Sequence, residues 1–132
     1  MPTYAESQMI LVIDHDARVN DALRMLLTDA GYKAVAASDL DAAVHLLSSL
    51  KVDLVITNYM EPAYRRGDRW PVLEMFKHLV DPGTPLIVLT TSPDEVGQSA
   101  RQLGVADLIG KPFQLDNLLQ RIERALEGRR QH

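Results

Sequence analysis

The chain has 132 residues, a length that fits one compact domain and is short for two. Hydrophobic residues make up 46% of it and charged residues 24%, which excludes a disordered or collagen-like chain. It has no cysteine, which excludes disulfides and thiol chemistry, and its net charge of -4 at pH 7 argues against direct binding of nucleic acid. No apolar run reaches the roughly 18 residues of a membrane span and residues 1–8 lack the features of a signal peptide, so we expect a cytoplasmic protein.

Five short apolar segments recur along the chain and predict five β-strands. The first, third and fourth are apolar without alternation, which is typical of strands that are buried on both faces of a parallel sheet. The predicted strands are Met9 to Ile13, Lys33 to Ala37, Asp53 to Thr57, Leu86 to Thr90, and Asp107 to Ile109.

Between these strands, apolar residues spaced by three and four predict amphipathic helices. The first contains Leu23 and Leu27, and the second is expected to begin with a capping box formed by Ser38 and Asp41. A further helix is expected to open at Ser92, and the last is expected to run from Gln114 to Glu127. Four glycines are expected to mark turns or helix ends: Gly31, Gly83, Gly104 and Gly128.

The alternation of strand and helix predicts a doubly wound α/β domain, a three-layer sandwich with helices on both faces of a five-stranded parallel sheet. We expect one domain over residues 1–132, with its core at 9–127 and frayed ends at 1–8 and 128–132. Ligand chemistry in such folds lies outside the carboxyl ends of the strands. That places the candidate site at Asp14, His15, Asp16, Asn58, Thr90, Thr91 and Lys111.

Four segments give the chain a family likeness. They are ILVIDHD at residues 10–16, DLVITNYMEP at 53–62, PLIVLTT at 85–91 and GVADLIGKPF at 104–113. In this order and spacing the chain resembles, over residues 9–127, the receiver domain of bacterial two-component response regulators. The resemblance implies a flavodoxin-like fold with strand order 2-1-3-4-5, no enzyme activity, and signalling through a sensor kinase or another protein.

Half of the family's functional positions are matched. In the family an acidic pair after the first strand holds Mg²⁺, an Asp ending the third accepts phosphate, and a hydroxyl and a lysine contact that phosphate. Asp14 matches the first acid, Thr90 the hydroxyl and Lys111 the lysine. The resemblance also implies a cis peptide bond between Lys111 and Pro112.

The other positions depart from the family. His15 stands where the second acid is expected, Asn58 where the phosphoacceptor Asp is expected, and Leu108 where an aromatic residue switches rotamer. An amide is a very poor substitute for a carboxylate nucleophile, and the loss of two carboxylates weakens a Mg²⁺ site. We therefore expect a degenerate pseudo-receiver with weak or absent Mg²⁺ binding and no cofactor. Two alternatives stay open: phosphorylation by an unusual route, and a scaffold without any phosphoryl signal.

The acidic pocket allows two interpretations of His15. Its neighbours Asp14 and Asp16 favour a protonated imidazole, which could replace the charge of the missing metal. Equally, His15 could be an ordinary polar residue at a strand end. In either case Lys111 is expected to pair with Asp14 or with the side-chain oxygen of Asn58.

Two surfaces are candidates for protein contacts. An irregular segment carries aromatic and arginine residues, a composition that is typical of an interaction hot spot. The alternative is that this segment folds back as a lid over the pocket. Its residues are Tyr64, Arg65, Arg66, Arg69 and Trp70. The resemblance also implies an interaction face formed by the helix that opens at Ser92, the strand from Asp107 to Ile109 and the helix from Gln114 to Glu127. The protein is expected to be a monomer or a homodimer that forms through this face. That face would include Glu95, Gln98, Gln102, Gln114, Asn117, Arg121 and Arg124.

Other α/β functions lack their motifs. A nucleotide-binding domain needs a glycine-rich turn after its first strand, where this chain has Asp14, His15 and Asp16. A serine hydrolase of this architecture needs a GxSxG turn, which the sequence does not contain.

Overall fold

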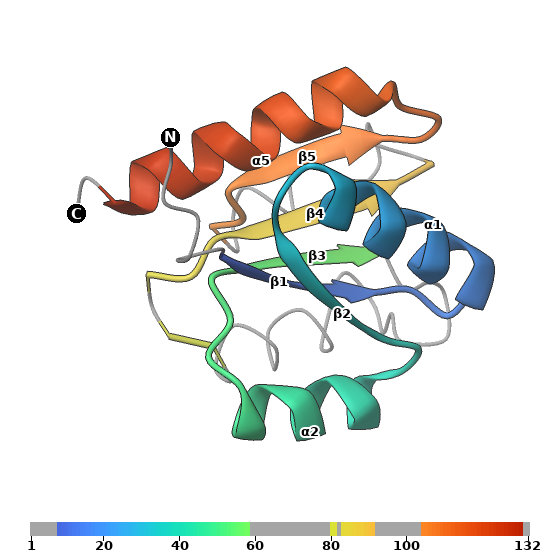
Figure 1. Cartoon of the computed structure of the whole chain (residues 1–132), viewed down its shortest axis with the longest axis vertical. Helices are drawn as coiled ribbons and strands as arrows, with labels where there is room; N and C mark the ends of the chain where they lie inside the picture. Colours follow the sequence, from blue (N-terminus) through green and yellow to red (C-terminus); the bar gives the residue numbers. More distant parts are fainter. Residues whose placement is uncertain (1–7, 59–79, 82, 92–103, 131–132) are drawn as a thin grey trace.

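The computed structural model of the chain describes residues 8–58, 80–81, 83–91 and 104–130 (Figure 1). Its elements are β1 (Met9–Ile13), α1 (Ala17–Asp29), β2 (Lys33–Ala37), α2 (Leu40–Ser49), β3 (Leu54–Asn58), β4 (Leu86–Thr90), β5 (Asp107–Gly110) and α5 (Leu115–Arg130). All five predicted strands are confirmed, with shifts of one residue at the ends of β3 and β5. The helix expected at Ser92 and the segment from Tyr64 to Trp70 lie outside the described residues.

The strands form one parallel sheet in the order β2-β1-β3-β4-β5, as the family resemblance implied. Ile10 lies beside Leu54 in the register of β1 and β3, and Val88 lies beside Leu108 in that of β4 and β5. Helices α1 and α5 cover one face of the sheet and α2 covers the other (Figure 1). The prediction of a doubly wound, three-layer α/β fold is therefore confirmed.

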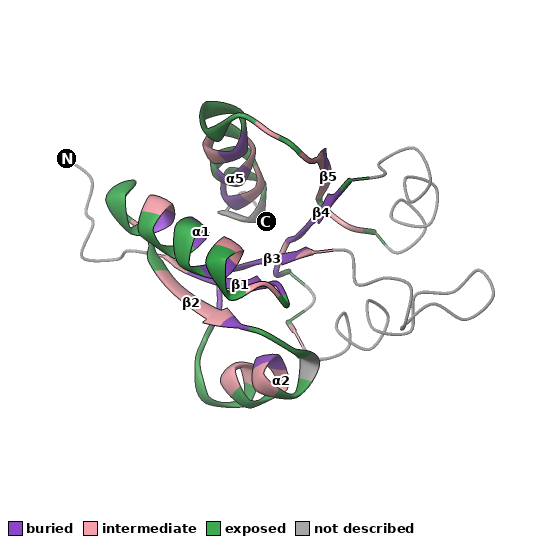
Figure 2. Ribbon diagram, turned by 90° about the vertical axis from the view of Figure 1, so that its right-hand side faces the viewer, coloured by how far each residue is buried: buried purple, intermediate pink, exposed green. Residues whose placement is uncertain are grey.

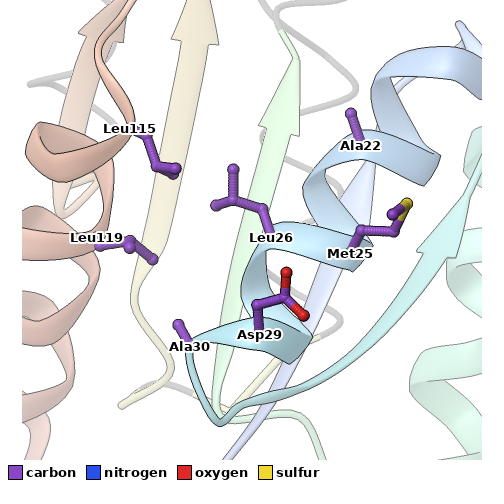
Figure 3. Close-up of a pocket in the computed structure, with 7 residues that line it drawn as sticks. All are labelled: Ala22, Met25, Leu26, Asp29, Ala30, Leu115 and Leu119. Atoms are coloured by element: carbon purple, nitrogen blue, oxygen red, sulfur yellow. The ribbon is translucent and has the colours of Figure 1, made fainter.

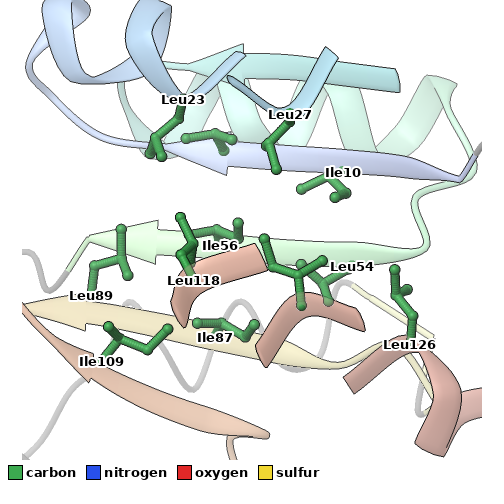
Figure 4. Close-up of a cluster of buried hydrophobic side chains, with 12 residues drawn as sticks. Ile10, Leu23, Leu27, Leu54, Ile56, Ile87, Leu89, Ile109, Leu118 and Leu126 are labelled. Atoms are coloured by element: carbon green, nitrogen blue, oxygen red, sulfur yellow. The ribbon is translucent and has the colours of Figure 1, made fainter. Parts of the chain in front are cut away.

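Two apolar clusters, one on each face of the sheet, hold the layers together. Successive residues of a strand point to opposite faces, so neighbours such as Ile10 and Leu11 enter different clusters. The cluster under α1 and α5 is the larger (Figure 4) and contains Ile10, Val12, Leu23, Leu27, Leu54, Ile56, Ile87, Leu89, Ile109, Leu118, Ile122 and Leu126. Burial is concentrated in β1, β3 and β4, which Figure 2 shows between the helical layers.

Two expected helix boundaries are wrong. Helix α2 is capped by Asp39 rather than Ser38, because the Asp39 carboxylate accepts a 2.8 Å hydrogen bond from the backbone N–H of Ala42. Helix α5 continues past the expected end at Glu127, through Gly128 to Arg130. A glycine within a helix costs only about 1 kcal/mol, and the buried Leu126 anchors this last part of α5. Within the described ranges, no helix combines the length and apolar character that crossing a membrane requires.

The packing of α5 gives a direct test of this core. Replacing Leu118, which is fully buried, by alanine should lower the free energy of unfolding by about 2–5 kcal/mol. The same change at Leu115, which is 41% exposed on the same helix, should cost about 1 kcal/mol or less. Urea denaturation of the two variants measures both values. Equal losses would contradict the packing described above.

Candidate functional site

Polar side chains from four strands meet at the carboxyl edge of the sheet. Asp14 directly follows β1, Asn58 and Thr90 are the last residues of β3 and β4, and Lys111 directly follows β5. Asn58 lies beside Leu89 in the sheet register, and Thr90 lies beside Gly110. Because all four strands are parallel, their carboxyl ends share one edge, and Asp14, Asn58, Thr90 and Lys111 lie together there, whereas Thr91 is exposed just after β4.

Lys111 is the centre of this site. Its Nζ donates a 2.7 Å hydrogen bond to Oδ1 of Asn58 and lies 3.5 Å from Oδ2 of Asp14. The Lys111 side chain is 23% exposed and that of Asp14 only 3%. The backbone N–H of Lys111 donates to the carbonyl of Thr90 at 2.7 Å, and the Lys111–Pro112 peptide bond is cis, as implied. Both expected partners of Lys111 are therefore confirmed.

Asp14 is held in place through its main chain and one carboxylate oxygen. Its N–H donates to the carbonyl of Ala37 at 3.2 Å, and its Oδ1 accepts a 2.9 Å hydrogen bond from the N–H of Asp16. Its other oxygen, Oδ2, is buried and accepts no hydrogen bond from the described residues. The neighbouring Lys111 ammonium is the cation that balances this buried charge.

The other two residues of the acidic pocket have different surroundings. His15 is 76% exposed, with Nδ1 3.6 Å from Oδ1 of Asp14. Asp16 caps α1, and its pKa is lowered because it accepts hydrogen bonds from the backbone N–H of Arg18, at 2.9 Å, and from the Arg18 guanidinium. In the part of the chain that the structure describes, no three His, Asp or Glu side chains gather as metal ligands.

Strand β5, which ends directly before Lys111, is connected to α5 by hydrogen bonds. Leu108 is half-buried and packs against the apolar cluster under α2. Nη1 of Arg121 donates to Oδ1 of Asp107 at 3.1 Å and to the carbonyl of Leu108 at 3.2 Å. Arg121, expected on an open interaction face, is thus partly engaged inside the domain. Gln114, Asn117 and Arg124 are exposed, whereas Glu95, Gln98 and Gln102 lie outside the described residues.

Sequence reasoning missed two features beside this site. Asn20 is 5% exposed and bonds the ends of β1 and β2; a polar residue on the buried side of α1, three and seven positions before Leu23 and Leu27, was the available signal. The second feature is an apolar groove of about 490 Å³ between α1 and α5 (Figure 3). Its lining residues are Ala22, Met25, Leu26, Asp29, Ala30, Leu115 and Leu119, none of which belongs to the carboxyl-edge site.

Comparison with known proteins identifies the family. Residues 10–123 match the family model of the response regulator receiver domain. The chain belongs to this family. As a receiver domain of response regulators, it is a signalling module.

The relatives agree with this assignment. The transcriptional regulatory protein GlrR of Escherichia coli K12 is 35% identical over 123 residues, which are 89% of this chain and 26% of that protein. The response regulator MprA of Mycolicibacterium vanbaalenii is 34% identical over 120 residues, 89% of this chain and 49% of that protein. The chain therefore spans about a quarter to a half of the length of these relatives.

A solved structure confirms the fold. The signal receiver domain of an HD domain-containing protein from Pseudomonas fluorescens Pf-5 superimposes with a TM-score of 0.80 and 28% sequence identity. The match covers 96% of this chain and 99% of that chain.

The pairing of Lys111 with Asp14 predicts a measurable coupling. Lys111→Met leaves the buried Asp14 carboxylate without its cation, so it should lower the free energy of unfolding by about 1–3 kcal/mol. Asp14→Asn in the Lys111→Met background should restore part of that loss. Lys33→Met, at an exposed position of β2, should change stability by less than about 0.5 kcal/mol. If Lys111→Met costs no more than Lys33→Met in urea denaturation, the pairing does not stabilise the fold.

Proposed function

We propose that this receiver domain acts through protein contacts without accepting a phosphoryl group at residue 58. The observation that carries the proposal is the 2.7 Å hydrogen bond from Lys111 Nζ to the amide oxygen of Asn58. An acyl phosphate forms by attack of a carboxylate oxygen, and a carboxamide has no ionised oxygen to make that attack. At position 58 the side chain serves as a hydrogen-bond acceptor for Lys111 instead.

The charge balance of the site supports the same proposal. Lys111 carries one positive charge, Asp14 carries one negative charge, and Asn58 is neutral, so these three side chains balance without a bound ion. An incoming phosphoryl group would have to compete with Asp14 and Asn58 for the Lys111 ammonium. The site is therefore electrostatically complete as it stands.

The residues present do not fit the Mg²⁺ ion that the family uses. Mg²⁺ requires near-octahedral oxygen ligands with carboxylate charge. Among the described residues Asp14 is the one buried carboxylate, its Oδ2 faces the ammonium group of Lys111, and His15 offers an exposed nitrogen where an acid is expected. We propose that the domain uses no metal or other cofactor.

The partners we propose are proteins: a sensor kinase or another signalling protein, with no direct contact to nucleic acid and no enzyme activity in this domain. Relatives carry names such as transcriptional regulatory protein and DNA-binding response regulator, so the whole protein could act on DNA through another part.

Because Leu108 replaces an aromatic switch and Arg121 connects α5 to β5, we propose that the face of β5 and α5 keeps one conformation.

Phosphorylation can be tested directly. The protein incubated with acetyl phosphate and Mg²⁺ should show an unchanged intact mass, because Asn58 offers no carboxylate nucleophile. The double variant His15→Asp with Asn58→Asp should gain one phosphoryl group, because Thr90 and Lys111 remain to contact it. A stoichiometric gain by the unchanged sequence, lost in mild base, would favour phosphorylation by an unusual route.

Magnesium binding gives a second test. Millimolar Mg²⁺ should leave the melting temperature nearly unchanged, since a ligand that binds the folded state weakly stabilises it little. The double variant with aspartates at 15 and 58 should melt several degrees higher in Mg²⁺ than in K⁺ of equal ionic strength. The same Mg²⁺-specific rise in the unchanged protein would show that the existing residues do bind the ion.

A further inference from the structure

Asn20 is the polar residue that connects α1 to the edge of the sheet. It is 5% exposed, and its Nδ2 donates to the backbone carbonyl of Asp14 at 2.8 Å and to that of Ala37 at 3.2 Å. A side-chain amide nitrogen carries two protons, so both of its donors are used. One side chain of α1 thereby holds the carboxyl ends of β1 and β2.

These hydrogen bonds complete the fixation of Asp14. Its N–H donates to the same Ala37 carbonyl, its carbonyl accepts from Asn20, and its Oδ1 accepts from the N–H of Asp16. Each of these contacts involves a main-chain atom of Asp14 or Asp16, and none of them involves Lys111. They leave Oδ2 as the carboxylate oxygen that faces Lys111, at 3.5 Å.

The surroundings of the side-chain oxygen of Asn20 indicate that its two N–H donors, and not this acceptor, are the reason for an amide at position 20. Oδ1 of Asn20 is buried and accepts no hydrogen bond from the described residues, which is unfavourable for a polar atom withdrawn from water. Leucine has the same branched arrangement of side-chain heavy atoms, although it is larger, and it would occupy this position without a buried polar atom. Packing alone therefore does not account for an amide at this position.

We infer that Asn20 is a positioning residue, which fixes the Asp14 carboxylate opposite Lys111 and so couples the placement of α1 to the charge balance of the site. This inference rests on the geometry of Asp14 and holds whether or not residue 58 is phosphorylated. A displacement of α1 moves Asp14, and Lys111 then loses its charged partner.

The accessibility of Lys111 reports this role. In Asn20→Leu, acetylation of Lys111 by dilute acetic anhydride should become several-fold faster relative to exposed Lys51, as read from peptide masses. The matched control is Leu27→Ala, a buried change on the same helix that contacts no polar group of the site. It should lower the melting temperature at least as much and leave the ratio of Lys111 to Lys51 labelling unchanged. An unchanged ratio in Asn20→Leu, or an equal rise in Leu27→Ala, would overturn the inference.

A second measurement needs no substitution and applies even if Asn20→Leu fails to fold. Both side-chain amide protons of Asn20 should exchange with solvent as slowly as the backbone amides of β1, because both are hydrogen-bonded and buried. The side-chain amide of Asn117, which is exposed on α5, provides the fast reference. Exchange of the Asn20 amide at the rate of Asn117 would show that the two bonds are not maintained in solution.

Discussion

The burial of three central strands on both faces governs the structure. β1, β3 and β4 each contribute side chains to both apolar clusters, and their polar residues, including the buried Thr57, are confined to the carboxyl ends of the strands and the residues that follow. Asp14, Asn58 and Thr90 therefore stand at one edge, and the cis peptide after Lys111 lies beside them. The composition of the site follows from this constraint: the polar groups are close together, partly withdrawn from water, and have to satisfy one another.

We propose that the chain departs from the family pattern at this edge. In that pattern the positions of His15 and Asn58 hold carboxylates, and the lysine contacts a phosphoryl group. Here the lysine already has a carboxylate at 3.5 Å and an amide oxygen at 2.7 Å. Lys111 thus makes a polar connection between the ends of β1, β3 and β5. This connection is made entirely by residues of the same chain, so it is compatible with membership of the family.

The features that could be predicted from the sequence are those set by residues close together in the chain. Apolar runs located all five strands, and the first residue of the third was misplaced because Asp53 instead accepts a hydrogen bond from the N–H of Met9, which is distant in the chain. The pairing of Lys111 could be foreseen because strand ends share an edge. The spacing of Asn20 with Leu23 and Leu27 indicates that it is buried, but its partner Ala37 lies 17 residues away, so the contact itself could not be predicted. Ser38 and Asp39 are both good caps, and only the backbone geometry selects Asp39.

The central claim is that Lys111, Asp14 and Asn58 form a site that is complete without a phosphoryl group. Beryllium fluoride, a tetrahedral analogue that binds a carboxylate as a phosphoryl group would, tests it in ¹H–¹⁵N spectra recorded with Mg²⁺. We expect unchanged amide signals for Asn58, Thr90 and Lys111, whereas in the double variant His15→Asp with Asn58→Asp these signals should shift. A new, slowly exchanging set of these signals in the unchanged protein would contradict it.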